Sequence, residues 1–227
     1  MRLRDIQVCI DVLASTPRLA ALANFYSALS ALEVERHNVR ATVAKLLIDV
    51  YAEDANVREA AYVVDRVARV NLKRRLLNTA ADGSLPTTEE SQFFSSLLRD
   101  AAELSGSTQG WDASQLKGVF ATVEATSDKA YEWTQPKSER WYSARKRKAL
   151  VLFRLEVNRT SIYVQIVSAT GQELERKLVR ASDYAGALFL DGVGPHMATK
   201  LVDSKYVFVD VFGRSVCSVD LAVKNES

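Results

Sequence analysis

A change of hydrophobic period near residues 137–148 is the feature that most constrains the fold of this chain. Before this segment, apolar residues recur at helical spacing. After it they alternate, as in strands with one buried face, first at Val151, Phe153 and Leu155 and then at Ile162 and Val164. The pattern predicts an α+β fold, with a helical N-terminal part of about six helices and a C-terminal antiparallel β part of about five strands.

Capping signals and apolar stripes place the expected helices. Thr16-Pro17 predicts a helix that continues to about residue 32, and Thr87 with Glu90 has the spacing of a capping box. Apolar stripes predict further helices over residues 6–13, 39–50, 57–72 and 112–123, with a last helical fragment before Pro136. Cap signals support two of these helices, Asn56 with Glu59 before residues 57–72 and Asp112 with Gln115 before residues 112–123. Residues 105–110 are expected to form a short flexible linker.

The expected strands cover residues 151–157, 162–166, 173–180, 205–211 and 215–223. The first three should form an antiparallel meander, with Leu174 and Leu178 pointing inward, and the last two should form a hairpin.

Two domains are therefore predicted. Residues 1–136 would form a helical domain that is a candidate for homo-oligomerisation, and residues 137–227 a basic junction followed by the antiparallel β domain.

Positive charge is local in this chain. Residues 1–110 carry 13 Lys/Arg and 14 Asp/Glu, a balance of −1, whereas residues 111–227 carry 17 and 14, a balance of +3. Residues 137–148 alone hold six Lys/Arg and one Glu, a balance of +5, with two aromatic residues between them. This distribution favours a discrete anion-binding patch over a general polycationic surface.

Clustered cations beside aromatic side chains can neutralise phosphates and stack on bases. The first hypothesis is therefore a non-catalytic nucleic-acid-binding protein, with RNA and DNA both open. Its phosphate-binding and stacking residues would be Arg140, Trp141, Tyr142, Arg145, Lys146, Arg147 and Lys148. A structural or matrix-like assembly protein that binds an anionic membrane or an acidic protein is the alternative, and a solvated linker is the plain structural interpretation of the run.

Residues 185–202 contain a glycine-rich pattern: Leu190, Gly192-Val193-Gly194, Ala198 and Leu201-Val202. The pattern resembles the helix-hairpin-helix motif of DNA-binding proteins. In that family a hairpin presents backbone amides and a helix N-terminus to a phosphate. The resemblance implies that Gly192, Gly194, His196 and Lys200 face the nucleic-acid backbone. The segment before Leu190 also has the character of a strand that ends in an Asp-Gly turn.

Signatures of catalysis are weak. Glu175-Arg-Lys177 has the spacing of metal-dependent nucleases, but the preceding strand offers no aspartate, so an enzyme acting on nucleic acid is the weakest hypothesis. His37 and His196 lack partners at metal-ligand spacing, and no catalytic residue, metal or cofactor is expected.

No apolar run approaches the ~20 residues of a membrane span. Two cysteines in separate elements favour a reducing compartment, and the chain is expected to be soluble and intracellular (cytoplasmic or nuclear), not secreted.

Overall fold

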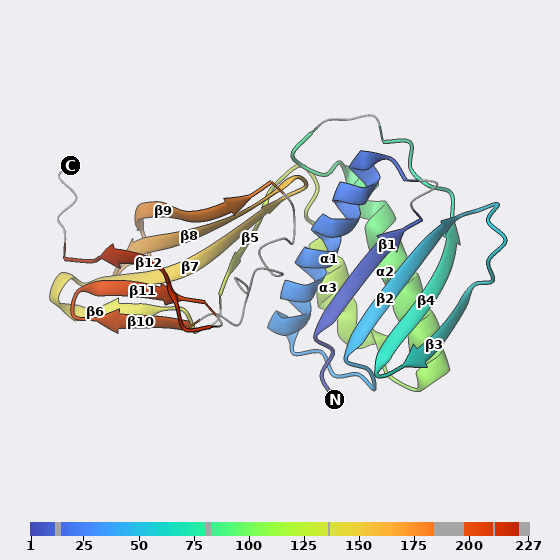
Figure 1. Ribbon diagram of the computed structural model, residues 1–227, viewed down its shortest axis with the longest axis horizontal. Coiled ribbons are helices and arrows are strands. Elements are labelled where there is room, and N and C mark those ends of the chain that lie inside the picture. Colours follow the sequence, from blue (N-terminus) through green and yellow to red (C-terminus); the bar gives the residue numbers. More distant parts are fainter. Residues whose placement is uncertain (12–14, 80–82, 136, 184–197, 211, 223–227) are drawn as a thin grey trace. The chain divides into compact units, whose positions relative to one another are not determined.

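The computed structural model describes residues 1–11, 15–79, 83–135, 137–183, 198–210 and 212–222. Within these ranges the chain is α+β, with three α-helices and twelve strands in three sheets (Figure 1). It divides into two compact units. Unit 1 comprises Met1–Tyr131 and Glu156–Asn158, and unit 2 comprises Glu132–Leu155 and Arg159–Ser227.

Unit 1 is built on a four-stranded sheet in the order β1-β2-β4-β3. β1 (Asp5–Ile10), β2 (Lys45–Ala52) and β4 (Val67–Arg74) are parallel, and β3 (Ala60–Val64) pairs antiparallel with β4. The sheet is buried on one face. Alternate residues of its three parallel strands face the core there: Ile6 and Val8, Leu46, Ile48 and Val50, and Ala68, Val70 and Leu72.

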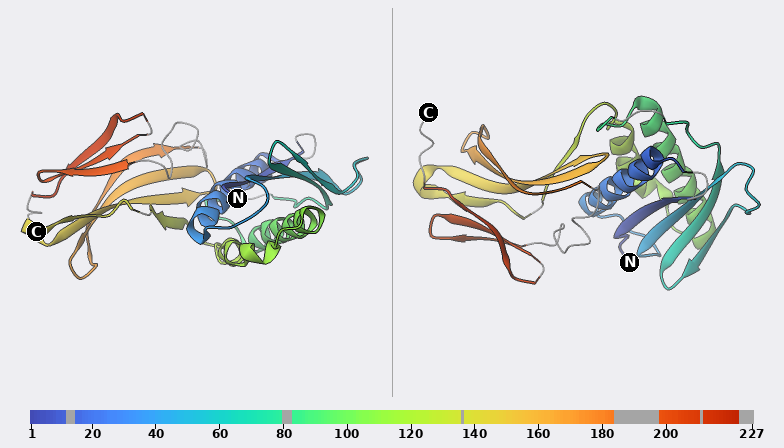
Figure 2. Two further views of the ribbon diagram at one scale, coloured as in Figure 1. Left: turned by 90° about the horizontal axis from the view of Figure 1, so that it is seen from below. Right: turned by 45° about the horizontal axis from the view of Figure 1, so that its top comes forward.

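Helices α1 (Pro17–His37), α2 (Thr88–Gln109) and α3 (Lys117–Glu124) complete unit 1, with the 3₁₀ turn η1 (Ala113–Leu116) before α3. Figure 2 shows α2 and α3, in green, on one side of the sheet. The Thr16 side chain caps α1, and Thr87 and Glu90 form a reciprocal capping box at the start of α2. Where α1 meets α2, the Tyr26 ring stacks on Phe94 at 4.5 Å between centroids.

Unit 2 contains two sheets, in which the pairs β6–β7, β8–β9, β10–β11 and β11–β12 are antiparallel. One has the order β5-β7-β8-β9, with β6 also paired to β7, and the other has the order β10-β11-β12. The strands of the first sheet are β5 (Tyr131–Thr134), β6 (Arg140–Tyr142), β7 (Arg147–Glu156), β8 (Arg159–Ser168) and β9 (Glu173–Ser182). Those of the second are β10 (Ala198–Val202), β11 (Lys205–Val209) and β12 (Ser215–Asp220). A further 3₁₀ turn, η2 (Ser143–Arg145), joins β6 to β7. Phe153, Ile162, Val164 and Phe208 are buried in this unit.

The predicted helical N-terminal part of about six helices is wrong. Residues expected to form helices at 6–13, 39–50 and 57–72 fall largely in β1 to β4, and the expected fragment before Pro136 is β5. The helices at Thr16-Pro17, at Thr87 and near residues 117–124 do form. The physical reason is that Ile6, Val8 and Ile10 alternate at period two, while Ile6 and Ile10 also fit helical spacing.

Two smaller predictions also need correction. Residues 105–109 are not a linker, because α2 continues to Gln109 and ends at Gly110 in the left-handed conformation. Leu174 and Leu178 do not point inward, since both are exposed on β9, which lies at the end of its sheet.

Among the described residues, no helix is long and apolar enough to cross a membrane.

Candidate nucleic-acid interface

The basic run folds as a short hairpin in unit 2. β6 and β7 pair antiparallel, so that Trp141 lies opposite Lys148 and Tyr142 opposite Arg147. The chain reverses through η2, and Lys146 completes the turn in the left-handed region, with φ of 49° and its amide donating to the Ser143 carbonyl at 3.1 Å. The sequence run thus becomes the tip of a hairpin rather than an extended junction.

Hydrogen bonds fix the base of this hairpin to the sheet that carries β10 and β11. The Ser138 carbonyl accepts from the Thr199 hydroxyl at 3.1 Å and from the Tyr206 hydroxyl at 2.9 Å. Burial raises the pKa of Tyr206 to about 12, so this phenol keeps its proton at neutral pH. Arg140 Nη2 donates to the Thr199 carbonyl at 2.7 Å, and Arg140 Nη1 donates to the carbonyls of Lys137 and Glu139. Arg140 therefore anchors the hairpin.

The remaining side chains of the run differ in their availability. Lys148 Nζ contacts Glu139 Oε2 at 2.9 Å, and Arg147 and Tyr142 are half-buried. Arg145 and Lys146 are exposed, and neither side chain forms an ion pair with any carboxylate in the described ranges. Trp141 is 47% exposed on the same hairpin. The tip thus presents two cations beside one accessible aromatic ring.

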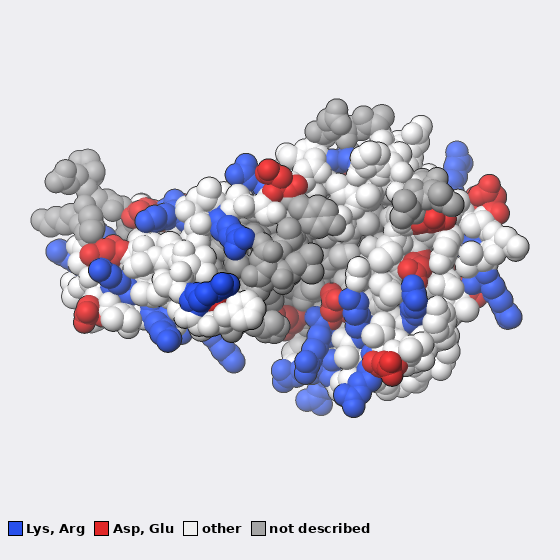
Figure 3. All heavy atoms as spheres, in the orientation of Figure 1, with Lys and Arg blue, Asp and Glu red and all other residues white. Residues whose placement is uncertain are grey.

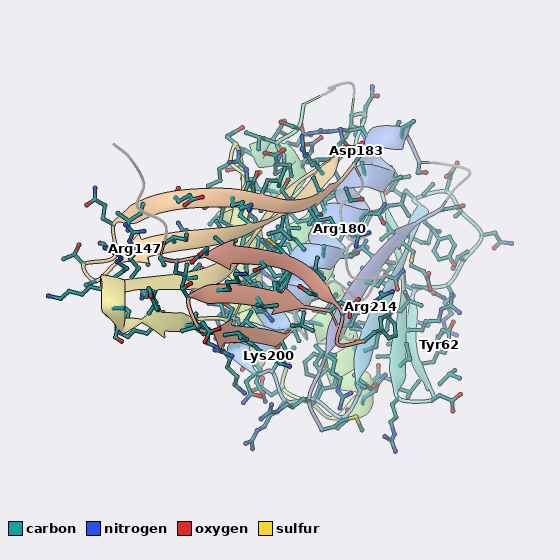
Figure 4. All side chains as sticks on the ribbon, turned by 60° about the vertical axis from the view of Figure 1, so that its left-hand side comes forward. Tyr62, Arg147, Arg180, Asp183, Lys200 and Arg214 are labelled. Carbon is teal, nitrogen blue, oxygen red and sulfur yellow. The ribbon has the colours of Figure 1, made fainter. Side chains whose placement is uncertain are left out.

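Lys200 lies on β10 and is exposed. Figure 4 shows it apart from Arg147, which marks the end of the β6–β7 hairpin. Residues 198–202 form a strand, where the helix-hairpin-helix resemblance implies a second helix. Gly192, Gly194 and His196 lie outside the described residues. The structure therefore places Lys200 on a strand and not on the second helix that the resemblance implies.

A buried carboxylate in unit 1 was not expected from the sequence. The Glu33 side chain is fully buried and accepts hydrogen bonds from the hydroxyls of Tyr131 and Thr122, the latter at 3.0 Å. His37 Nε2 lies 3.2 Å from the same carboxylate, and Arg36 lies 3.3 Å from it. With this many donors around one carboxylate, Glu33 fits a role in joining α1 to α3 and to Tyr131 within unit 1. No group of three potential metal ligands occurs in the part of the chain that the structure describes.

Sequence reasoning also missed a group of cations in unit 1. Arg2, Arg4, Arg40 and Arg66 are exposed near the starts of the parallel strands. Arg2 and Arg4 are close in sequence, but Arg40 and Arg66 are tens of residues away, so only the strand order could have shown that the four lie together. Comparison of the chain with protein-family models, curated proteins and solved structures finds no match.

Proposed function

We propose that this chain is a non-catalytic nucleic-acid-binding protein whose β6–β7 hairpin contacts the phosphate backbone. The observation that carries the proposal is the exposed pair Arg145 and Lys146, unpaired by carboxylates within the described residues and placed at a hairpin tip with Trp141. Cations with no internal partner can release counterions from a polyanion without first breaking an ion pair.

The side chains of the run take different roles in this proposal. Arg145 and Lys146 bind phosphates, and the guanidinium of Arg145 can reach two phosphate oxygens at once. Trp141 offers a face on which an unpaired base can stack. Arg140 holds the hairpin in place through its three carbonyl acceptors, and Lys148 contributes less because Glu139 already contacts it.

The test is a salt titration of binding to single-stranded and duplex oligonucleotides of about 20 nucleotides. The variant Arg145→Ala/Lys146→Asn removes both charges, and asparagine tolerates the left-handed backbone at position 146. Affinity should fall roughly tenfold or more, because two charged hydrogen-bond donors are lost. The slope of log K against log salt should shrink by about 1.4 for single strands and about 1.8 for duplexes.

A matched control removes one arginine and one lysine elsewhere on the surface. Arg58→Ala/Lys129→Asn has the same change in net charge, and both residues are exposed. This control should bind with nearly the parent affinity. Equal losses in the two variants would show a dependence on net charge alone and would overturn the assignment to the hairpin.

The role of Trp141 separates single-stranded from duplex binding. Trp141→Ala should weaken single-strand binding by about 1–3 kcal/mol and leave duplex binding nearly unchanged, because stacked base pairs offer no free face.

Vesicle binding tests the membrane alternative. If the hairpin variant Arg145→Ala/Lys146→Asn keeps its oligonucleotide affinity but loses binding to phosphatidylserine vesicles, the membrane-binding alternative replaces the proposal.

A further inference from the structure

The main chain brings four arginines together at one edge of unit 1. Arg2 and Arg40 lie opposite each other in an isolated antiparallel bridge. The Arg4 amide donates to the Ala44 carbonyl at 2.8 Å, and the Ala44 amide donates to the Arg66 carbonyl at 2.8 Å. Arg4, Ala44 and Arg66 directly precede β1, β2 and β4, so they occupy equivalent positions on three neighbouring parallel strands. We call Arg2, Arg4, Arg40 and Arg66 the arginine edge.

The side chains of the arginine edge point to solvent. Leu3, Val39 and Ala41, which alternate with Arg2, Arg4 and Arg40 along the chain, are buried. All four arginines are exposed, and none forms an ion pair within the described ranges. Figure 3 shows Lys and Arg gathered at this end of unit 1, near the N-terminus and the adjoining ends of β2 and β4 in Figure 1.

Nearby carboxylates do not neutralise this edge. Asp5 contacts Lys45 at 2.9 Å. Asp65 precedes Arg66 in the β3–β4 turn, where both residues have positive φ, and it makes no ion pair within the described part of the chain. Four arginines against Asp65 leave a local charge of +3, with Asp5 and Lys45 cancelling each other.

This arrangement costs stability in the free protein. Like charges directly opposite each other in an antiparallel pair are destabilising, and Arg2 and Arg40 are such a pair. Neighbouring strands lie about 4.8 Å apart, so the main chain at Arg4 and at Arg66 is separated by roughly 10 Å. An array of that width is broader than one phosphate group, and a ligand with several phosphates in a row would relieve the repulsion at more than one position.

We infer that the arginine edge is a second phosphate-binding surface, on which the backbone of the same nucleic acid binds. The choice of nucleic acid as occupant rests on the proposed function. The structure supplies the rest: four exposed guanidiniums that form no ion pair with any described residue, held by backbone hydrogen bonds, each able to bind phosphate through two parallel N–H donors. All four cations are arginine, the residue whose fork matches phosphate.

The test uses the full chain with all four arginines replaced: Arg2→Gln, Arg4→Gln, Arg40→Gln and Arg66→Asn. Asparagine is chosen at position 66 because φ is 68° there. The salt slope for single-stranded oligonucleotides should shrink by about 2.8 and the affinity at low salt by roughly a hundredfold or more. The thermal midpoint should stay equal or rise, because the variant removes a like-charge pair.

A second variant with lysine at all four positions keeps the charge and removes the fork. It should retain most of the salt slope and lose a smaller part of the affinity. A glutamine/asparagine variant that binds with the parent slope would overturn the inference. Loss of binding to phosphatidylserine vesicles without loss of oligonucleotide binding would overturn it too, in favour of a lipid surface.

The two surfaces can fail separately. If the hairpin variant Arg145→Ala/Lys146→Asn loses binding while the arginine-edge variant does not, the proposed function stands and this inference is wrong. If only the arginine-edge variant loses binding, the arginine edge stands and the role of the hairpin is wrong. A parent chain that binds no oligonucleotide at low salt removes both.

Discussion

Arg18 and Glu90 form a buried ion pair between the first turns of α1 and α2. Their side chains are 7% and 5% exposed, with Arg18 Nε and Nη2 donating to the two carboxylate oxygens at 2.9 and 2.8 Å. Arg18 also donates to the carbonyls of Gly83 and Leu85. We expect Arg18→Ala to lower the free energy of unfolding by about 3–5 kcal/mol, because it leaves a buried carboxylate without its cation. Denaturant titration measures this loss.

A surface pair provides the comparison. Arg99 and Glu124 lie 3.7 Å apart and are each 50% exposed. Glu124→Gln should cost less than about 1 kcal/mol, because water screens both charges. Similar losses for Arg18→Ala and Glu124→Gln would contradict the importance assigned to burial.

The same carboxylate makes stability depend on pH. Burial of Glu90 favours its neutral form, but hydrogen bonds from Arg18 and from the Thr87 amide outweigh burial and hold the pKa of Glu90 below its usual value. Its stabilising contribution is therefore present above the unfolded-state pKa, near 4.5, and is lost as the pH falls through the lower folded-state pKa.

Glu90→Gln should accordingly have a shallower dependence of unfolding free energy on pH between about pH 5 and pH 3. Denaturant titrations at several pH values measure the slope. A residual slope will remain, since Asp210 and Glu59 also have lowered pKa values. An unchanged slope in Glu90→Gln would show that Glu90 does not contribute to acid unfolding.

At the scale of elements, cap residues predicted some helix starts correctly and one wrongly. Thr16-Pro17 and Thr87 with Glu90 mark real starts, because each threonine side chain accepts from a backbone amide of the first turn. Asn56 with Glu59 has the same capping-box spacing, yet β3 begins at Ala60, and Glu59 instead accepts from the Lys73 amide. Val67, Val70 and Lys73 of β4 could likewise lie on a helix. The β-branched residues and the partner strands decided for a sheet, and those partners are distant in sequence.

Gly106 shows why α2 contains a segment that looks like a linker. A Cβ at this position would lie 2.8 Å from the Trp111 carbonyl oxygen, so the close return of the chain requires glycine. Gly106→Ala should destabilise the protein by about 1–2 kcal/mol, because overpacking against the backbone outweighs a gain of about 1 kcal/mol in helix propensity. Thermal or denaturant unfolding measures the change.

The neighbouring exposed position is a control for helix propensity. Ser107→Ala should alter stability by no more than about 0.5 kcal/mol. If Gly106→Ala stabilises the protein instead, the chain near Trp111 must move away at little cost, and the close approach would not explain the glycine.

At the scale of the molecule, the sequence located one cationic surface and not the other. Arg145 and Lys146 are adjacent, so their charge is visible without a fold. The arginine edge needs β1, β2 and β4 to be aligned in parallel, and its four members are spread over residues 2–66. The sequence also could not show that Arg140 has an internal partner, since Thr199 is 59 positions away from it, whereas the partner of Lys148, Glu139, lies within the basic run itself.

Two cationic surfaces on one chain predict additive salt dependence. Because they are covalently joined, binding at one raises the local concentration of the same strand at the other. We therefore expect a variant that lacks both surfaces to lose a salt slope equal to the sum of the two separate losses, about 4.2 for a long single strand. Fluorescence anisotropy across a salt series measures all four proteins. If the slope losses of the two single variants fail to add up to the loss of the double variant on a strand of about 40 nucleotides, a strand shared by the two surfaces is excluded.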